Sequence, residues 1–296
     1  NLKVAEYVTT TTPIFAKEIE KLNKNVFVLP NAINPKEQQF ISKPEPSKKL
    51  RIGWLGGSSH LQDLEILNGL VSKLKSRDLL DKVQFVLCGF DLRGTHTEID
   101  PITKQQRVRP ILPKESVWYK YEQIFTDDYK AISPEYKDFL LKFVQEEYPN
   151  VENEPYRRVW TKNITSYASN YNLFDISLAP LEENMFNKVK SQLKVIEAGF
   201  HHKAIIAQNF GPYQLDIKNA FEYGGVFNDK NNGVLIDSYK NHKDWFDAIK
   251  NLINNPEMVK TLQDNLHSTV KDLYSIDKVT EDRKNLYLKL INYEKN

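Results

Sequence analysis

The regular alternation of strand-like and helix-like segments is the feature of this chain that most constrains its fold. Short apolar runs at residues 50–55, 83–87, 174–179 and 203–207 are typical of buried strands, and amphipathic helical patterns lie between them. Helical crossover connections favour strands that run parallel within one sheet. The sequence therefore predicts an α/β fold, a Rossmann-like open parallel sheet flanked by helices, with any ligand at the carboxyl ends of the strands.

Residues 174–213 carry the densest set of signals in the chain. The polar segment 181–190 predicts a loop, and Ser191 is the expected N-cap of a helix whose apolar residues recur at helical spacing. Lys190 and Lys194 flank this helix start, where the helix dipole disfavours cations. Two lysines beside free backbone N–H groups are explained if a phosphate binds between them. An ordinary surface helix with solvated charges explains them equally well at this level.

A second candidate loop, with the sequence GGSSH, follows the strand at residues 50–55. Its candidate binding residues are Gly56, Gly57, Ser58 and His60. An amphipathic helix comes next, and Ser59 and Gln62 form a capping-box pair at its start. A two-glycine turn before a helix can present N–H groups to a pyrophosphate. Such turns are common, and a solvent-exposed residue of the first helical turn is an equally good interpretation of His60.

The segments DISLAPL, FNKVKSQLKVIEAG and FGPY resemble, in this order, the C-terminal, nucleotide-sugar-binding half of GT-B glycosyltransferases of the retaining group 1, or family 4-like, branch. That branch carries two glutamates in this place; Glu197 matches the second, whereas Val189 stands where the first would be. The resemblance implies that Lys190 and Glu197 belong to the catalytic centre. It also implies a donor site formed by Gly56, Gly57, Ser58, His60, Ser191, Lys194, Gly211 and Tyr213. One turn into its helix, Glu197 is expected to bind ribose hydroxyls and not to act as a general acid or base.

The activity implied by the resemblance is a retaining, metal-independent transfer of sugar from a nucleotide-diphosphate sugar to an unknown glycan or lipid-linked acceptor. No cofactor is expected, and no acidic metal-binding pair stands in a convincing place. Two alternatives remain open at this point. One is a non-hydrolysing sugar-nucleotide epimerase-like enzyme, and the other is a non-catalytic nucleotide-sugar-binding module, an alternative that the departure at Val189 keeps open. A dinucleotide oxidoreductase is disfavoured because no G-x-G-x-x-G fingerprint is present.

The chain is interpreted as two unequal parts. Residues 1–45, with the string TPIFAKEIEKLNKNVFVLPNAI, resemble the last β-α-β piece of a GT-B N-terminal domain and the start of a linker. Thr12 and Pro13 predict a helix start, after a strand at residues 4–9. Residues 46–296 form the nucleotide-sugar-binding domain. The acceptor site, and any peripheral membrane association, would belong to the remainder of the N-terminal domain.

An insertion, expected to be mainly helical, interrupts the larger part at about residues 92–160, because a plain βαβ unit does not need so many residues between strands. Within it, Asp127 and Asp128 are expected to be solvated, and Arg107 and Arg109 to lie on the surface. After it, Trp160, Tyr167 and Tyr171 are expected on or beside a helix at residues 163–169, packed in the core and not stacked on a ligand.

Composition narrows the classes of protein to which this chain could belong. A net charge of +2 argues against a nucleic-acid-binding protein whose affinity depends on a broad basic face. Cys88 is the only cysteine, so an internal disulfide is impossible, and its apolar surroundings predict a buried thiol. No apolar run approaches the roughly 18 residues of a membrane span. We expect a reduced, cytoplasmic setting.

Overall fold

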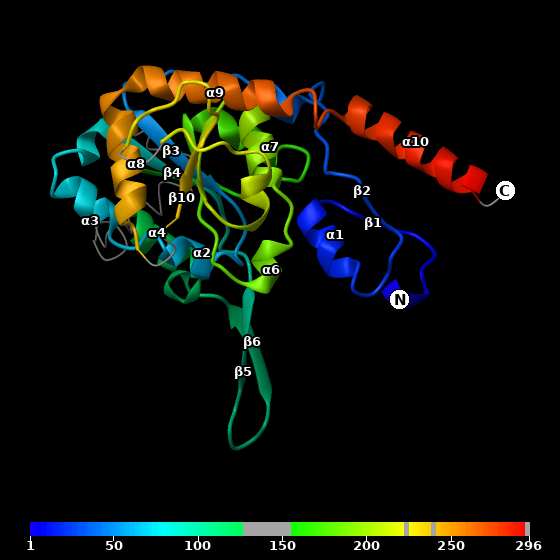
Figure 1. The fold of residues 1–296 in the computed structure, drawn as a ribbon. Helices are drawn as coiled ribbons and strands as arrows, with labels where there is room; N and C mark the ends of the chain where they lie inside the picture. The colour runs from blue at the N-terminus through cyan, green and yellow to red at the C-terminus, as the bar shows by residue number, and fades with distance from the viewer. Residues whose placement is uncertain (127–154, 222–224, 238–240, 294–296) are drawn as a thin grey trace.

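A parallel six-stranded sheet forms the centre of the computed structural model, which describes residues 1–126, 155–221, 225–237 and 241–293 (Figure 1). The strand order is β10-β9-β8-β3-β4-β7, and every neighbouring pair is parallel. The strands are β3 (Leu50–Leu55), β4 (Val83–Phe90), β7 (Tyr156–Trp160), β8 (Ile176–Ala179), β9 (Ala204–Gln208) and β10 (Val234–Ile236). The predicted α/β fold with an open parallel sheet is confirmed.

The central strands are continuous apolar runs because both of their faces are covered. Along β4, Phe85 and Leu87 join one hydrophobic cluster, whereas Val86 and Cys88 join the cluster on the opposite face. The alternation follows from the two-residue period of a strand. Cys88 is fully buried, and this burial raises the pKa of its thiol to about 12, so the prediction of a buried core thiol is confirmed.

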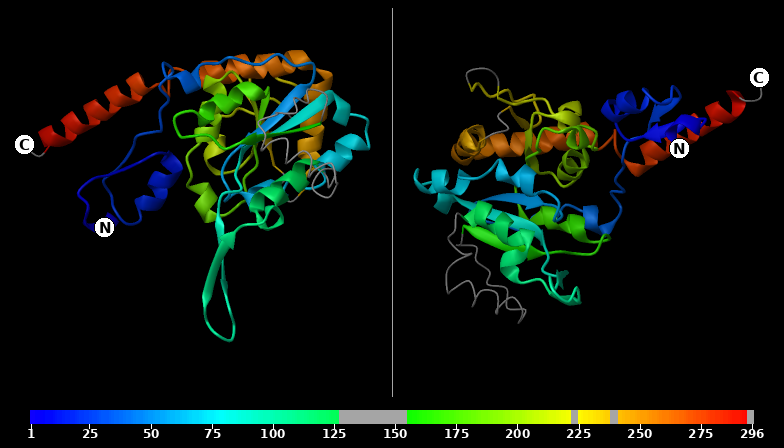
Figure 2. Two further views of the ribbon diagram at one scale, coloured as in Figure 1. Left: turned by 180° about the vertical axis from the view of Figure 1, so that it is seen from behind. Right: turned by 90° about the horizontal axis from the view of Figure 1, so that it is seen from below.

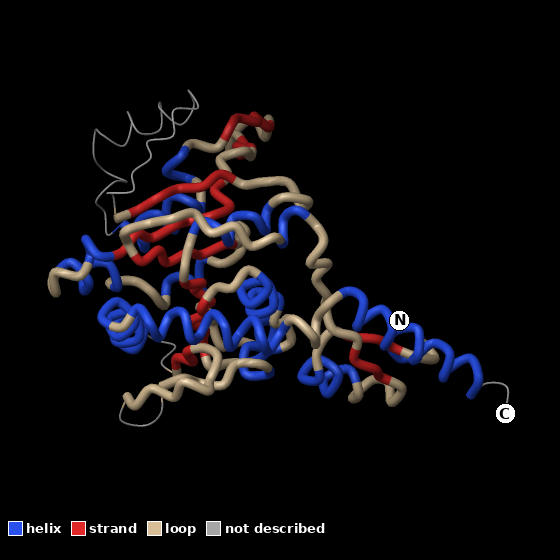
Figure 3. Tube along the Cα trace, turned by 90° about the horizontal axis from the view of Figure 1, so that it is seen from above, coloured by secondary structure: helices blue, strands red, loops and turns tan. Residues whose placement is uncertain are grey.

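Helices cover both faces of the sheet (Figures 1 and 3). The first cluster is supplied by α2 (Leu61–Glu65), α3 (Leu70–Lys75), α4 (Val117–Thr126) and α8 (Lys243–Asn254). The second is supplied by α7 (Leu193–Phe200) and the 3-10 segment η5 (Tyr167–Leu173), while α9 (Pro256–Val270) contributes to both. The single helix expected after β3 is divided into α2 and α3, because Gly69 between them adopts a left-handed φ of 89°.

A small unit precedes the sheet and consists of β1 (Val8–Thr10), α1 (Pro13–Ile19) and β2 (Val26–Val28), with the two strands parallel. Thr12 caps α1 as predicted, since its Oγ1 accepts a hydrogen bond from the Phe15 N–H at 3.1 Å. Residues 2–4 form the 3-10 helix η1 (Leu2–Val4), so the strand expected from residue 4 is wrong at its start. The last helix, α10 (Ile276–Tyr293), lies beside this unit, away from the sheet (Figures 1 and 2).

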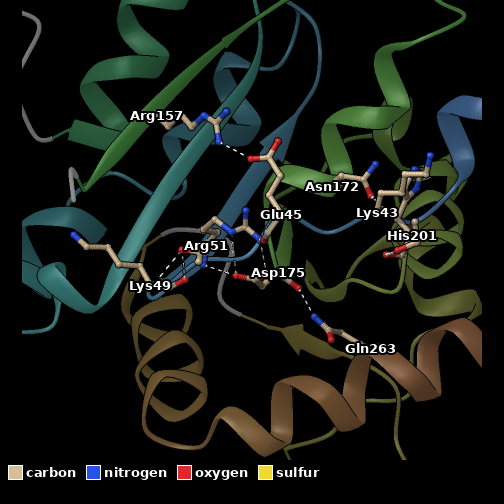
Figure 4. A network of polar contacts seen from close by, with 11 residues as sticks. Lys43, Glu45, Lys49, Arg51, Arg157, Asn172, Asp175, His201 and Gln263 are labelled. Carbon is tan, nitrogen blue, oxygen red and sulfur yellow. Dashed lines mark hydrogen bonds and ion pairs between the residues drawn. The ribbon is translucent and has the colours of Figure 1, made fainter. Parts of the chain in front are cut away.

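The segment that joins the two parts is attached to the amino-terminal edge of the sheet (Figure 4). The guanidinium of Arg51 donates to the Glu45 carbonyl at 2.6 Å and pairs with Asp175 at 3.1 Å. Asn172 Oδ1 accepts from the Lys43 N–H at 2.7 Å. The linker after η2 (Gln38–Phe40) is therefore held in place by hydrogen bonds. The proposed boundary near residue 45 stays a prediction.

The insertion begins after β4 with an antiparallel hairpin, β5 (Thr95–Ile99) and β6 (Gln106–Pro110), followed by the 3-10 turn η4 (Pro113–Glu115) and α4 (Figure 1). Its described part is thus not mainly helical, and β7 belongs to the sheet, so the insertion ends before residue 156. Arg109 pairs with Glu98 at 2.7 Å and Glu115 at 2.8 Å on the exposed hairpin.

The rest of the insertion, residues 127–154 with the pair Asp127 and Asp128, lies outside the described residues. Within the described ranges, no helix combines the length and the apolar character that a bilayer crossing requires.

Candidate functional site

One cavity of about 470 Å³ lies at the carboxyl-terminal edge of the sheet, where both predicted loops meet. The GGSSH turn follows β3 and the lysine segment follows β8, and these two strands are neighbours. Eight of the ten residues that the sequence and the resemblance indicate line this cavity, namely Gly56, Gly57, His60, Lys190, Ser191, Lys194, Glu197 and Tyr213. Ser58 is exposed and does not line it, and Gly211 forms a left-handed turn (φ 56°) packed on the Lys188 backbone.

Aromatic side chains pack against the glycine turn and hold it in place. A side chain at Gly56 would come within 2.5 Å of the Trp54 ring, so this position requires glycine, whereas Gly57 has open space around it. Tyr121, from α4, accepts a hydrogen bond from the His60 N–H at 2.8 Å and donates to the Gly57 carbonyl at 3.3 Å. His60 therefore occupies the N-cap position of α2 and no side chain caps the helix, so the predicted Ser59 capping box is wrong.

Asp63 connects this turn to the lysine segment. Its carboxylate lies 2.7 Å from His60 Nδ1 and accepts from the Glu182 N–H at 2.8 Å and from Asn187 Nδ2 at 2.9 Å. Burial alone would raise the pKa of Asp63, but these hydrogen bonds and the nearby Lys190 hold it below its ordinary value. Because a carboxylate accepts, the imidazole proton belongs on Nδ1. Asp63 was not among the predicted site residues, although its three-residue spacing from His60 is a usable signal.

The segment before α7 is more ordered than predicted. The expected loop contains the short helix α6 (Met185–Lys188), which Asn184 caps by accepting from the Asn187 N–H at 2.8 Å. Ser191 is not the N-cap of α7, because Gln192 takes that position. The Ser191 hydroxyl instead accepts a hydrogen bond from Asn31 Nδ2 at 2.9 Å. That contact joins the cavity to the segment after β2.

The two lysines differ in their surroundings. Lys194 donates from Nζ to the Leu55 carbonyl at the end of β3, and its Nζ lies 5.1 Å from the centre of the Trp54 ring. Burial of this amino group lowers the pKa of Lys194 to about 8. Lys190 Nζ lies 4.9 Å from the centre of the Phe186 ring, and no carboxylate within the described part of the chain forms an ion pair with it. Lys194 likewise forms no ion pair with a carboxylate among the described residues, so both amino groups supply positive charge to the cavity.

Glu197 is 4% exposed and accepts hydrogen bonds from two phenols, those of Tyr167 and of Tyr171, the latter at 3.1 Å. Burial raises the pKa of this carboxyl, while the phenols and Lys194 act in the opposite direction. Both tyrosines belong to η5, so the helix predicted at residues 163–169 is wrong. Tyr171 is buried in the core as expected, whereas Tyr167 lines the cavity.

Further lining residues that the sequence did not indicate include Gly89, Thr161, Lys162 and Asn170. They come from β4, from the end of β7 and from η5, which only the strand order brings beside β3. Among the residues that the structure describes, no group of three or more His, Cys, Asp or Glu side chains could hold a metal ion.

No protein-family model matches this chain, and no curated protein matches it. Several solved structures are similar. Sucrose-phosphate synthase from Thermosynechococcus elongatus gives a TM-score of 0.61 at 15% identity, covering 99% of this chain and 60% of that one. HepE from Anabaena, in complex with UDP and glucose, gives 0.59 at 10% identity, with coverages of 96% and 64%. A glycosyltransferase from Rickettsia africae gives 0.57 at 14% identity, with coverages of 96% and 63%.

This chain thus spans less than two thirds of the length of the solved proteins it resembles. At these identities the likeness is one of fold. Together with the six-stranded parallel sheet, it establishes that this chain has the fold of GT-B glycosyltransferases.

Proposed function

We propose that this chain is the donor-binding part of a glycosyltransferase and that its cavity holds the diphosphate of a nucleotide-diphosphate sugar. One observation carries the proposal: the glycine turn after β3 and the two lysines after β8 line the same cavity, although they come from distant parts of the sequence. Both sets of groups suit an anion, since backbone N–H groups donate hydrogen bonds and amino groups supply charge.

The lysines also suit the chemistry of transfer. When the sugar leaves, negative charge develops on the diphosphate, and preorganised cations in a poorly solvated place stabilise such charge effectively. Lys194 is already enclosed by protein, with its Nζ on the Leu55 carbonyl. We assign charge stabilisation to Lys190 and Lys194, and propose a retaining reaction without a metal ion on the strength of the resemblance to the group 1 branch.

The buried Glu197 is proposed to bind the ribose. Each of its oxygens accepts one phenolic hydrogen bond and keeps further acceptor capacity for a hydroxyl group. Tyr167 lines the cavity beside it, so this corner can accept a sugar ring. HepE was solved with UDP and with UDP-glucose, which supports uridine nucleotides as the first ligands to test.

Calorimetric titration with UDP, GDP, ADP and UDP-glucose tests the proposal. We expect at least one nucleoside diphosphate to bind, with a dissociation constant of roughly micromolar to millimolar order. The variant Lys194→Met should lose most of this affinity, whereas Lys188→Ala, which alters a lysine of α6 that does not line the cavity, should not. If none of the four compounds binds, the proposal is refuted.

A non-catalytic binding module remains the second candidate, because Val189 occupies the place of a glutamate that the group 1 branch carries. Binding alone does not separate the two. A transfer assay with UDP-glucose on a protein that also contains the acceptor site does, because only an enzyme would release UDP in an acceptor-dependent way.

A further inference from the structure

Asn170 has a buried carboxamide for which the described part of the chain supplies no hydrogen-bond partner. The residue is 0% exposed and lines the cavity, and neither its Nδ2 nor its Oδ1 is bonded to any described residue. Buried polar groups in folded proteins are almost always paired, so an amide that lacks both partners requires an explanation. Asn172, two residues further along η5, has both: its Oδ1 accepts from the Lys43 N–H at 2.7 Å and its Nδ2 donates to the Ile41 carbonyl at 3.4 Å. Asn170 therefore differs from Asn172 in the same segment. Other unpaired buried atoms, those of Thr10, Gln208 and Trp245, belong to residues that do not line the cavity.

The position of Asn170 indicates which part of a ligand it would meet. The cavity extends along the edge of the sheet, from the lysines after β8 and the glycine turn after β3 to Gly89 in β4 and Thr161 after β7. Three strand spacings of about 4.8 Å separate β8 from β7, roughly 14 Å in all. A nucleotide with its diphosphate at the lysines and its ribose at Glu197 would extend its base towards β4, and η5, which carries Asn170, packs against β3 and β4.

The chemistry of the side chain suits a nucleobase. A carboxamide presents an acceptor beside a donor, and base edges present the complementary pair of a donor beside an acceptor. A phosphate group offers acceptors only and would leave Oδ1 unpaired. We propose that Asn170 recognises the hydrogen-bonding edge of the nucleobase, an inference that rests on the proposed function and adds a determinant of nucleotide specificity to it.

A ligand must displace a neighbouring side chain to reach this amide. Lys162 is the exposed neighbour that also lines the cavity, and its Nζ donates to the hydroxyl of Ser169, the residue next to Asn170, at 3.0 Å. A single hydrogen bond holds this surface lysine, so it can move when a base enters.

The test compares ligands with and without a base. UDP, GDP, ADP, ribose 5-phosphate and inorganic pyrophosphate are titrated into the wild-type chain and into Asn170→Ala, with Asn172→Ala as the matched control from the same segment. Loss of one or two neutral hydrogen bonds should weaken the tightest nucleoside diphosphate about tenfold in Asn170→Ala. Pyrophosphate and ribose 5-phosphate should bind that variant as they bind the wild type, the preference among the three nucleotides should narrow, and Asn172→Ala should match the wild type.

Removal of the unpaired amide relieves the cost of burying an unsatisfied polar group, which offsets the packing that is lost, so thermal melting of Asn170→Ala should stay close to that of the wild type. If the smaller side chain impairs folding, Asn170→Leu keeps the branched shape and the number of heavy atoms and removes the polar atoms, with the same expected loss. Equal nucleotide affinity in the wild type and these variants would overturn the inference and leave the proposed function intact. An equal loss for pyrophosphate and nucleotide would also overturn it, because Asn170 would then act through the shape of the cavity. Failure of the wild type to bind any nucleotide would overturn both proposals.

Discussion

Raising the pH above 8 should weaken diphosphate binding, because it removes the proton from Lys194. Burial lowers the pKa of this residue from the ordinary 10.5 to about 8. An anion favours the charged amino group, so the ligand binds the protonated form and raises the pKa of Lys194 again. The second pKa of a phosphate group lies near 6, so the charge of UDP itself changes little above pH 7.

The magnitude follows from the titration. With a pKa of about 8, roughly nine tenths of Lys194 is protonated at pH 7 and about one tenth at pH 9. If only the protonated form binds, the dissociation constant of UDP rises about tenfold between these pH values, or about 1.4 kcal/mol. The effect on folding has the opposite sign, because the unfolded chain holds this proton more tightly. The free energy of unfolding should therefore increase from pH 8 towards 10.5, by at most about 3 kcal/mol from Lys194.

Calorimetry at pH 7, 8 and 9, in buffers of different ionisation enthalpy, measures both the affinity and the proton uptake. We expect an uptake of nearly one proton at pH 9 and little at pH 7, and Lys194→Met should abolish both the uptake and the pH dependence. Lys203 provides the control. Burial also lowers its pKa to about 8, but it lies beside Asp175 at the opposite edge of the sheet, so Lys203→Met should keep the wild-type profile. A constant affinity in the wild type, or the same decline in Lys194→Met, would refute the reasoning.

Four further outcomes are expected. Lys190→Ala should weaken UDP binding by about 1–3 kcal/mol, the contribution of a charged hydrogen bond. An equal loss of affinity in Lys188→Ala would show that the effect comes from the net positive charge of the segment and not from a direct contact of Lys190. Glu197→Gln should raise the dissociation constants of UDP and UDP-glucose alike, and retained affinity with abolished turnover in an active enzyme would exclude the ribose role. Asp63→Asn should lower the free energy of unfolding by about 2–3 kcal/mol in urea titrations, because Asp63 accepts hydrogen bonds from three groups; an unchanged midpoint would contradict this. Residues 1–296 alone should bind nucleotide yet transfer no sugar to any acceptor, and transfer by them would show that the proposed division into domains is mistaken.

The sheet and the meeting of the two loops could be predicted from local sequence, and the reason is periodicity. Continuous apolar runs such as Leu50–Leu55 are buried on both faces, and parallel strands bring their carboxyl ends to one edge. The turn at Gly56 and the lysine segment that begins at Lys190 each follow such a strand. Their placement at one edge of the sheet therefore follows from local sequence, and the pairing of β3 with β8 then brings them to one cavity.

The helix caps, the structure of the insertion and part of the cavity lining could not be predicted, because they depend on residues that lie far apart along the chain. Ser191 was expected to cap a helix, but its hydroxyl bonds to Asn31, and His60 takes the N-cap position of α2 with its N–H on the phenol of Tyr121. Asn170 lines the cavity because η5 packs against β3 and β4, which no local pattern specifies. Local sequence sets the hydrophobic period of each helix and strand. A polar side chain, in contrast, forms hydrogen bonds with whichever group the fold brings near it, so the tertiary structure alone decides its partner.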